Sequence, residues 1–175
     1  VIASRLDLMF RLGNLRDSSL VSKHLGCAPF VLCAAPAYLE RSGRPILLSE
    51  LPRFNCILDG SIQPEGRWEF IVNGERVSQT VSGNFSSLST EAVIEAVVEG
   101  LGLTYVPRYA VGEELEAEEV VELPLEQVEA ISLPIHALYN SRQHIAAKTR
   151  GFLDFFISHV DSQSGTHGVS GRRVQ

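Results

Sequence analysis

Polar side chains follow several short apolar segments, which is where small-molecule sites usually form in α/β proteins. Arg11 and Gly13 come after the first such segment, and Asp59-Gly60-Ser61 comes after a later one. Ser89 and Thr90 begin a predicted helix, so their hydroxyls stand beside free backbone N–H groups. A helix N-terminus favours an anion, and an arginine adds positive charge. We predict a binding site for an anionic or strongly polar small molecule at Arg11, Gly13, Asp59, Gly60, Ser61, Ser89 and Thr90.

Two of these residues have a purely structural alternative that the sequence leaves open. Ser89 can act only as a helix cap, because serine accepts a hydrogen bond from the first turn of a helix. Arg11 can form an ion pair at the end of its strand with Asp7 or Asp17. Either interpretation removes one polar contact from the predicted site.

The familiar motifs of enzymes and metal sites are missing from the chain. The five histidines, at positions 24, 136, 144, 159 and 167, are scattered, and we expect no metal site and no cofactor. There is no GxSxG, no P-loop and no GxGxxG after a strand. Gly100-Leu101-Gly102 follows a helix and is typical of a helix stop. A cysteine nucleophile with a distant histidine base stays open as an alternative, but we expect no enzyme.

Composition and charge indicate a globular domain. Hydrophobic residues make up 45% of the 175 residues and charged residues 21%. No apolar run is long enough to span a membrane, and the first residues do not resemble a signal peptide. The chain starts without Met, so we expect a fragment. A net charge of −6 argues against direct DNA binding.

Eight glutamates and no basic residue lie between positions 113 and 129. Leu115, Val120, Val121 and Leu123 interleave them as a buried stripe would, which favours a solvated helix face. A docking surface for a basic partner is the alternative.

The three cysteines, Cys27, Cys33 and Cys56, lack a CxxC pattern and sit among apolar residues, which is typical of a reducing cytoplasm.

Short apolar runs alternate with helical patterns, so we predict an α/β fold with a mostly parallel or mixed sheet. We expect segments 30–34, 55–58 and 103–106 to share one sheet, with helix 89–99 packed on its face. Asn73-Gly74 predicts a type I′ turn between strands 68–72 and 75–81. The other expected elements are strands 6–10 and 134–139, helices 37–42 and 143–159, a turn capped by Ser49, a short glutamate-rich helix and a disordered tail after 160.

An ordered series of segments resembles one known family. The most specific block is AAPAYLERSGRP at residues 34–45. It is preceded by DLMFRLGNLRDSSLVSKHLG and followed by SELPRFNCIL, WEF, EGLGLTYVP, PIHALY and KTRGFLDFF. In this order they resemble the effector-binding domain of LysR-type transcriptional regulators over about residues 5–160. The similarity is closest to a subgroup with an RxG strand end and a PAYL helix.

The resemblance implies a fold class, domain boundaries and partners. It implies an α/β periplasmic-binding-protein-like fold of type 2, with residues 1–30 and 132–160 in subdomain I, 31–131 in subdomain II and 161–175 as tail. Subdomain I is expected to be incomplete, and the DNA-binding helix-turn-helix to be absent from this chain. A small-molecule effector would bind between the subdomains of a cytoplasmic homodimer or homotetramer that binds DNA only through the missing part. The alternative is a solute-binding module of a transport system, which shares the fold.

Overall fold

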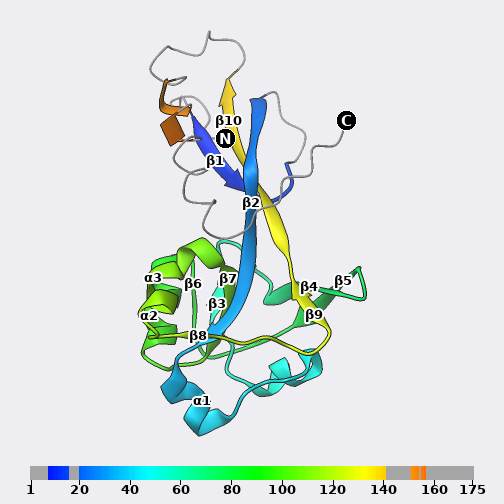
Figure 1. Cartoon of the computed structure of the whole chain (residues 1–175), viewed down its shortest axis with the longest axis vertical. Coiled ribbons are helices and arrows are strands. Elements are labelled where there is room, and N and C mark those ends of the chain that lie inside the picture. The colour runs from blue at the N-terminus through cyan, green and yellow to red at the C-terminus, as the bar shows by residue number, and fades with distance from the viewer. Residues whose placement is uncertain (1–7, 16–19, 141–150, 154, 157–175) are drawn as a thin grey trace. The chain divides into compact units, whose positions relative to one another are not determined.

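The computed structural model describes residues 8–15, 20–140, 151–153 and 155–156 (Figure 1). The chain divides into two compact units. Unit 1 combines Val1–Cys27 with Pro134–Gln175, and unit 2 is the continuous segment Ala28–Leu133. The chain passes between the units inside strands β2 (Leu20–Ala34) and β10 (Ser132–Asn140). Most of the predicted helix 143–159 and the predicted tail lie outside the described residues.

In unit 1, strand β1 (Met9–Leu12) pairs antiparallel with β10, so that Met9 faces Leu138 and Leu12 faces Ile135. β10 also neighbours β2, in the order β1-β10-β2. The strand predicted at 6–10 runs further along the chain, because the backbone stays extended until Gly13 turns it with a φ of 92°. The Gly13 N–H donates to the Pro134 carbonyl at 2.8 Å, which attaches this turn to β10.

In unit 2, the buried end of β2 pairs antiparallel with β7 (Leu103–Pro107) and with β8 (Val121–Glu122). Helix α2 (Thr90–Val98) covers this sheet. Its Val93 and Val97 join Val31, Cys33 and Val106 in one buried cluster. The prediction that 30–34 and 103–106 share a sheet under helix 89–99 is confirmed.

The prediction that 55–58 is a strand of this same sheet is wrong. Strand β3 (Leu58–Asp59) pairs in parallel with β6 (Ser86–Ser87) in a separate two-stranded sheet. Before it, the chain reaches the main sheet only at an isolated bridge from Cys56 to Leu103.

Close backbone packing explains the path of 55–57. A Cβ on Gly83 would lie 2.0 Å from the Cys56 carbonyl oxygen, and one on Gly102 would lie 2.2 Å from that of Asn55. Two glycines therefore hold the segment between neighbouring backbones. The Asn55 side chain donates to the Leu101 carbonyl at 2.7 Å and accepts from the Asn84 N–H at 2.9 Å. These side-chain hydrogen bonds and the close packing against the two glycines hold the segment in place of a regular ladder of strand hydrogen bonds.

A hairpin forms a third sheet with strand order β5-β4-β9. Strands β4 (Arg67–Val72) and β5 (Glu75–Thr80) are joined by Asn73 and Gly74, with φ values of 52° and 81°. Positive φ at both residues confirms the predicted type I′ geometry. Strand β9 (Val128–Ala130) pairs with the other edge of β4.

The remaining elements are short helices. Helix α1 (Pro36–Ser42) ends at Gly43 with a φ of 78°, as Pro36 and Gly43 predicted. The turn assigned to a Ser49 cap is instead the 3-10 helix η1 (Leu48–Arg53), which follows Leu47. Glu50 accepts from the backbone N–H groups of Ile46 and Leu47, so a carboxylate caps this helix.

The 3-10 helix η2 (Arg108–Ala110) precedes the glutamate-rich stretch, and helix α3 (Gly112–Glu116) forms the start of that stretch. Of the predicted stripe, Val120 and Leu123 are buried and Leu115 and Val121 are half-buried, whereas Glu113 and Glu116 are exposed, so the solvated face is confirmed and the stripe behind it is buried in part. Strand pairing is mixed and mainly antiparallel among the described strands. The described residues contain no helix that is both long and apolar enough to cross a bilayer.

Candidate functional site

The end of β3 meets the start of α2 through the carboxylate of Asp59. This residue is 1% exposed. Its Oδ1 accepts from the Ser61 N–H at 2.9 Å and from the Ser61 hydroxyl at 2.5 Å, and its Oδ2 accepts from the Thr90 hydroxyl at 2.6 Å. Thr90, which is 31 positions from Asp59, and the neighbouring Ser61 are therefore joined at one buried carboxylate.

The β3–β6 pair positions this cluster. The Gly60 N–H donates to the Ser87 carbonyl at 2.8 Å, which brings the end of β3 beside the residues that enter α2. A Cβ on Gly60 would approach Leu88 Cδ2 to 3.3 Å, so a small residue suits this position. Backbone pairing, and not the side chains alone, thus brings Asp59 and Thr90 together.

Ser89 caps α2. Its hydroxyl oxygen accepts from the Ala92 N–H at 3.3 Å and its hydroxyl donates to the Glu91 carboxylate at 2.6 Å. That bond, together with the backbone N–H of Glu91 itself, lowers the pKa of the Glu91 carboxyl. The structure therefore contains the cap that the sequence offered as one interpretation of Ser89.

A pocket of about 420 Å³ opens beside the Asp59 cluster. We call it the Tyr109 pocket, because the ring of Tyr109, 67% exposed, forms part of its wall. The surrounding protein partly desolvates the Tyr109 hydroxyl, and this desolvation, together with the charge of Asp59, raises the pKa of Tyr109. The pocket is lined by Ile62, Thr90, Glu91, Ile94, Glu95, Tyr109, Ala110 and Glu114.

Sequence reasoning missed Tyr109, Glu95 and Glu114 as candidates. Tyr109 is the second residue after β7, in η2, so the rule that sites form after strand ends could have found it. Glu95 lies one turn beyond Glu91 on α2, and the spacing of four residues places both on the same face of the helix. Glu114 was counted in the glutamate-rich surface, where nothing local distinguishes it from its neighbours.

Arg11 and Gly13 belong to unit 1, whereas the other five predicted residues belong to unit 2. Arg11 is exposed and faces His136 across the β1–β10 ladder. The two aspartates named as alternative partners of Arg11 lie outside the described residues.

The described residues offer polar and aromatic contacts for a ligand. Within them, no three histidine, cysteine or acidic residues are grouped to hold a metal ion. Cys33 and Cys56 are buried, and desolvation raises the pKa of each thiol to about 12. Cys27 is exposed, with its Sγ 3.8 Å from His24 Nε2. Carboxylates, hydroxyls and an aromatic ring around a pocket are groups that commonly line a small-molecule site.

Two strands connect the two units of this α/β chain, and polar residues lie where strands end. These features define the class of the protein as a ligand-binding domain. The family model described as "LysR substrate binding domain" matches residues 1–161. The chain belongs to this family, and its fold is periplasmic-binding-protein-like.

Relatives of known name agree with this family. The HTH-type transcriptional activator AaeR of Escherichia coli is 30% identical over 162 residues, covering 90% of this chain and 52% of AaeR. An uncharacterised HTH-type transcriptional regulator of Haemophilus influenzae is 30% identical over 86% of this chain and 52% of its own length. The chain thus spans about half the length of these curated relatives.

Solved structures show the same fold. The regulatory domain of CrgA, a LysR-type transcriptional regulator from Neisseria meningitidis, matches with a TM-score of 0.78 and 25% identity, over 89% of this chain and 76% of that one. The full-length Vibrio cholerae virulence activator AphB matches with a TM-score of 0.74 and 29% identity, over 91% of this chain and 54% of that one. The predicted family is confirmed, and none of these relatives is named as part of a transport system.

Proposed function

We propose that this chain is the effector-sensing part of a LysR-type transcriptional regulator, and that its effector binds beside the Asp59 cluster. The observation that supports this most directly is the pocket next to three joined site residues, in a chain of the LysR family. Gly60, Ser61, Ser89 and Thr90 provide the polar edge of the site. The proposal also includes Arg11 and Gly13, which belong to unit 1.

The mechanism is a shift in population and not catalysis. An effector that binds one arrangement of the two units better than others increases the share of molecules in that arrangement. The units are joined by β2 and β10, so a change of arrangement is absorbed in these two strands. In the whole protein, a homodimer or homotetramer in the cytoplasm, the change alters contact with DNA through a separate DNA-binding part.

The first experiment is a thermal-shift screen of small metabolites on the full-length protein. A ligand that binds only the folded state raises the melting temperature. For a compound that does so, calorimetry on Ser89→Ala should show affinity weakened about tenfold or less, because one polar contact contributes about 0.5–1.5 kcal/mol. If the effector is an anion, Arg11→Ala should weaken it more, since a charged contact contributes about 1.5–3 kcal/mol.

Unfolding of the ligand-free variants is the control, because Ser89→Ala also removes a helix cap worth about 1 kcal/mol. If both variants bind the effector as the wild type does, these residues are structural and the proposed site is wrong. If no compound raises the melting temperature, the effector-sensing role itself is contradicted.

A further inference from the structure

The lining of the Tyr109 pocket combines apolar side chains with charged side chains of a single sign. Ile62 and Ile94 supply apolar surface, and the Tyr109 ring stands at the side with two-thirds of its surface exposed. The charged residues of the lining are Glu91, Glu95 and Glu114, and the lining contains no lysine or arginine. Concavity, an uncovered aromatic ring and a single charge sign coincide at this one place.

Nearby groups reinforce the negative charge. Glu91 accepts from the Ser89 hydroxyl at 2.6 Å, which favours its ionised form. Asp59 lies behind Thr90, whose hydroxyl donates to it at 2.6 Å. Arg108, the basic residue next to Tyr109 in the chain, donates to Glu122 at 2.6 Å and is therefore engaged elsewhere.

The features that suggested an anion site have other uses in the structure. The Ser61 and Thr90 hydroxyls donate to Asp59, and the Ser89 hydroxyl donates to Glu91. Glu91 also stands in the first turn of α2, where its carboxylate already complements the positive end of the helix. An incoming anion would meet carboxylates here and few free donors.

We propose that the ligand of the Tyr109 pocket is a small organic cation, an amine or guanidine attached to an apolar or aromatic body. The carboxylates of Glu95 and Glu114 pair with the cationic head, and the face of Tyr109 attracts it through its π electrons. The body of the ligand covers Ile62 and Ile94. A pocket of about 420 Å³ suits a molecule of this kind. This inference rests on the proposed effector-sensing function and names the chemical class of the effector.

The test compares matched ligands of opposite charge on the full-length protein. The probes are a series of phenylalkylamines, with phenylethylamine as its first member, and phenylalkanoates of the same chain lengths. Calorimetry at low ionic strength should show that the best amine binds at least about tenfold tighter than its matched carboxylate. Added salt should weaken the amine, because its attraction to the pocket is electrostatic.

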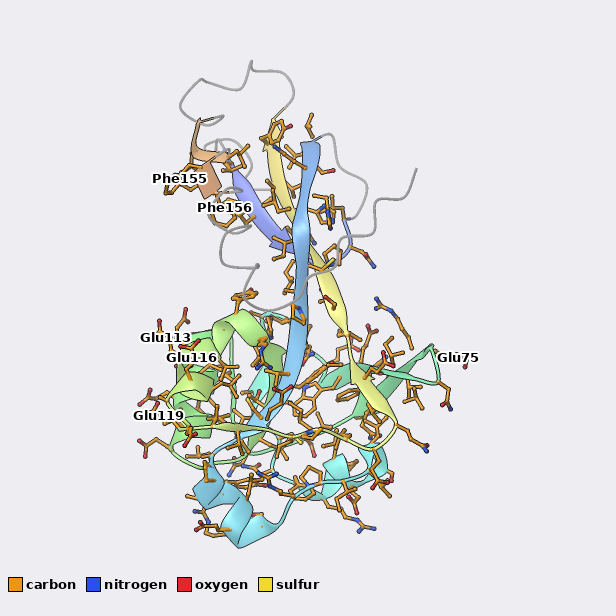
Figure 2. The ribbon with its side chains drawn as sticks, viewed as in Figure 1. Glu75, Glu113, Glu116, Glu119, Phe155 and Phe156 are labelled. Carbon is orange, nitrogen blue, oxygen red and sulfur yellow. The ribbon has the colours of Figure 1, made fainter. Side chains whose placement is uncertain are left out.

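Paired variants locate the effect. Glu95→Gln with Glu114→Gln keeps the side-chain shape and should weaken the amine about tenfold or more, since two charged contacts are lost. The matched control is Glu113→Gln with Glu116→Gln, which removes the same charge from side chains that project outward from α3 (Figure 2). Tyr109→Leu should weaken binding several-fold, and Tyr109→Phe should restore most of it because the ring face remains.

Three results overturn the inference: no amine binds, the carboxylates bind as well as the amines, or the control pair weakens binding as much as the pocket pair. In each case the effector-sensing role stands if the metabolite screen finds a ligand that depends on Ser89 or Arg11. Failure of that screen for ligands of either charge contradicts the proposed function instead.

Discussion

Thr90→Val tests whether the bond between Thr90 and Asp59 holds the end of β3 against the start of α2. Valine keeps the branched shape of threonine, so the change removes a hydroxyl without opening a cavity. The lost bond joins a hydroxyl to a carboxylate that is 1% exposed, at 2.6 Å. Such a bond to a charged group contributes about 1.5–3 kcal/mol.

The expected result is a lower melting temperature in the full-length protein. For a domain of this size, 1 kcal/mol corresponds to about 2–4 °C, so the loss should lie between about 3 and 12 °C. The low end applies if water reaches Asp59 in the variant. The control is Thr80→Val, at an exposed position on β5, where the shift should stay within about 0.5 kcal/mol.

A double-mutant cycle with Asp59→Ala separates the bond from other effects of the valine. Without its acceptor, Thr90 gains little from its hydroxyl, so Thr90→Val should cost less than about 0.5 kcal/mol in that background. Equal costs in both backgrounds would refute the reasoning. So would equal melting temperatures for Thr90→Val and Thr80→Val.

Three further outcomes are expected. Gly74→Val should lower stability by about 1–2 kcal/mol, because its φ of 81° strains a branched side chain, whereas Gly112→Ala should be neutral; an unchanged melting temperature for Gly74→Val contradicts this. An unfolded thiol ionises near pH 8.5 but buried Cys33 and Cys56 only near 12, so stability should fall as pH rises from about 8.5 to 12. The slope of melting temperature against pH should be shallower in Cys33→Ala, and an identical slope would show that this thiol is not responsible. In a gel shift at physiological salt, this chain of net charge −6 should not retain one promoter sequence over random DNA; specific retention would contradict the assignment of DNA binding to another part of the protein.

Local signals predicted the elements that depend on a few adjacent residues. Pro36 and Gly43 bracket α1, Ser89 begins α2, and Asn73-Gly74 forms the hairpin turn. Proline, glycine and asparagine restrict or permit the backbone angles by their own type, and the Ser89 hydroxyl bonds within the first turn of its helix, so neighbours in space are not needed to decide the outcome.

The path of 55–59 could not be predicted, because it depends on glycines far away in the sequence. Because Gly83 and Gly102 have no side chain, the backbone of this segment packs closely against both of them. The spacing of apolar residues along the sequence does not reveal that contact. The same limit applies to the site. The residue types of Asp59 and Thr90 indicated polarity, but only their meeting showed that the threonine hydroxyl serves the carboxylate. Tyr109 lines the pocket because the chain after β7 lies beside α2, and this contact between distant segments is also absent from the local sequence pattern.

The order of the two units along the chain affects how the protein emerges from the ribosome. Unit 2 is continuous, whereas unit 1 needs residues on both sides of it. β1 must wait for β10, whose Leu138 pairs with Met9, before its ladder can form. At about 5–20 residues per second, synthesis of the intervening segment takes on the order of ten seconds. Unit 2 can fold within that interval, while the apolar β1, including Phe10, remains exposed to chaperones until the C-terminal strand arrives.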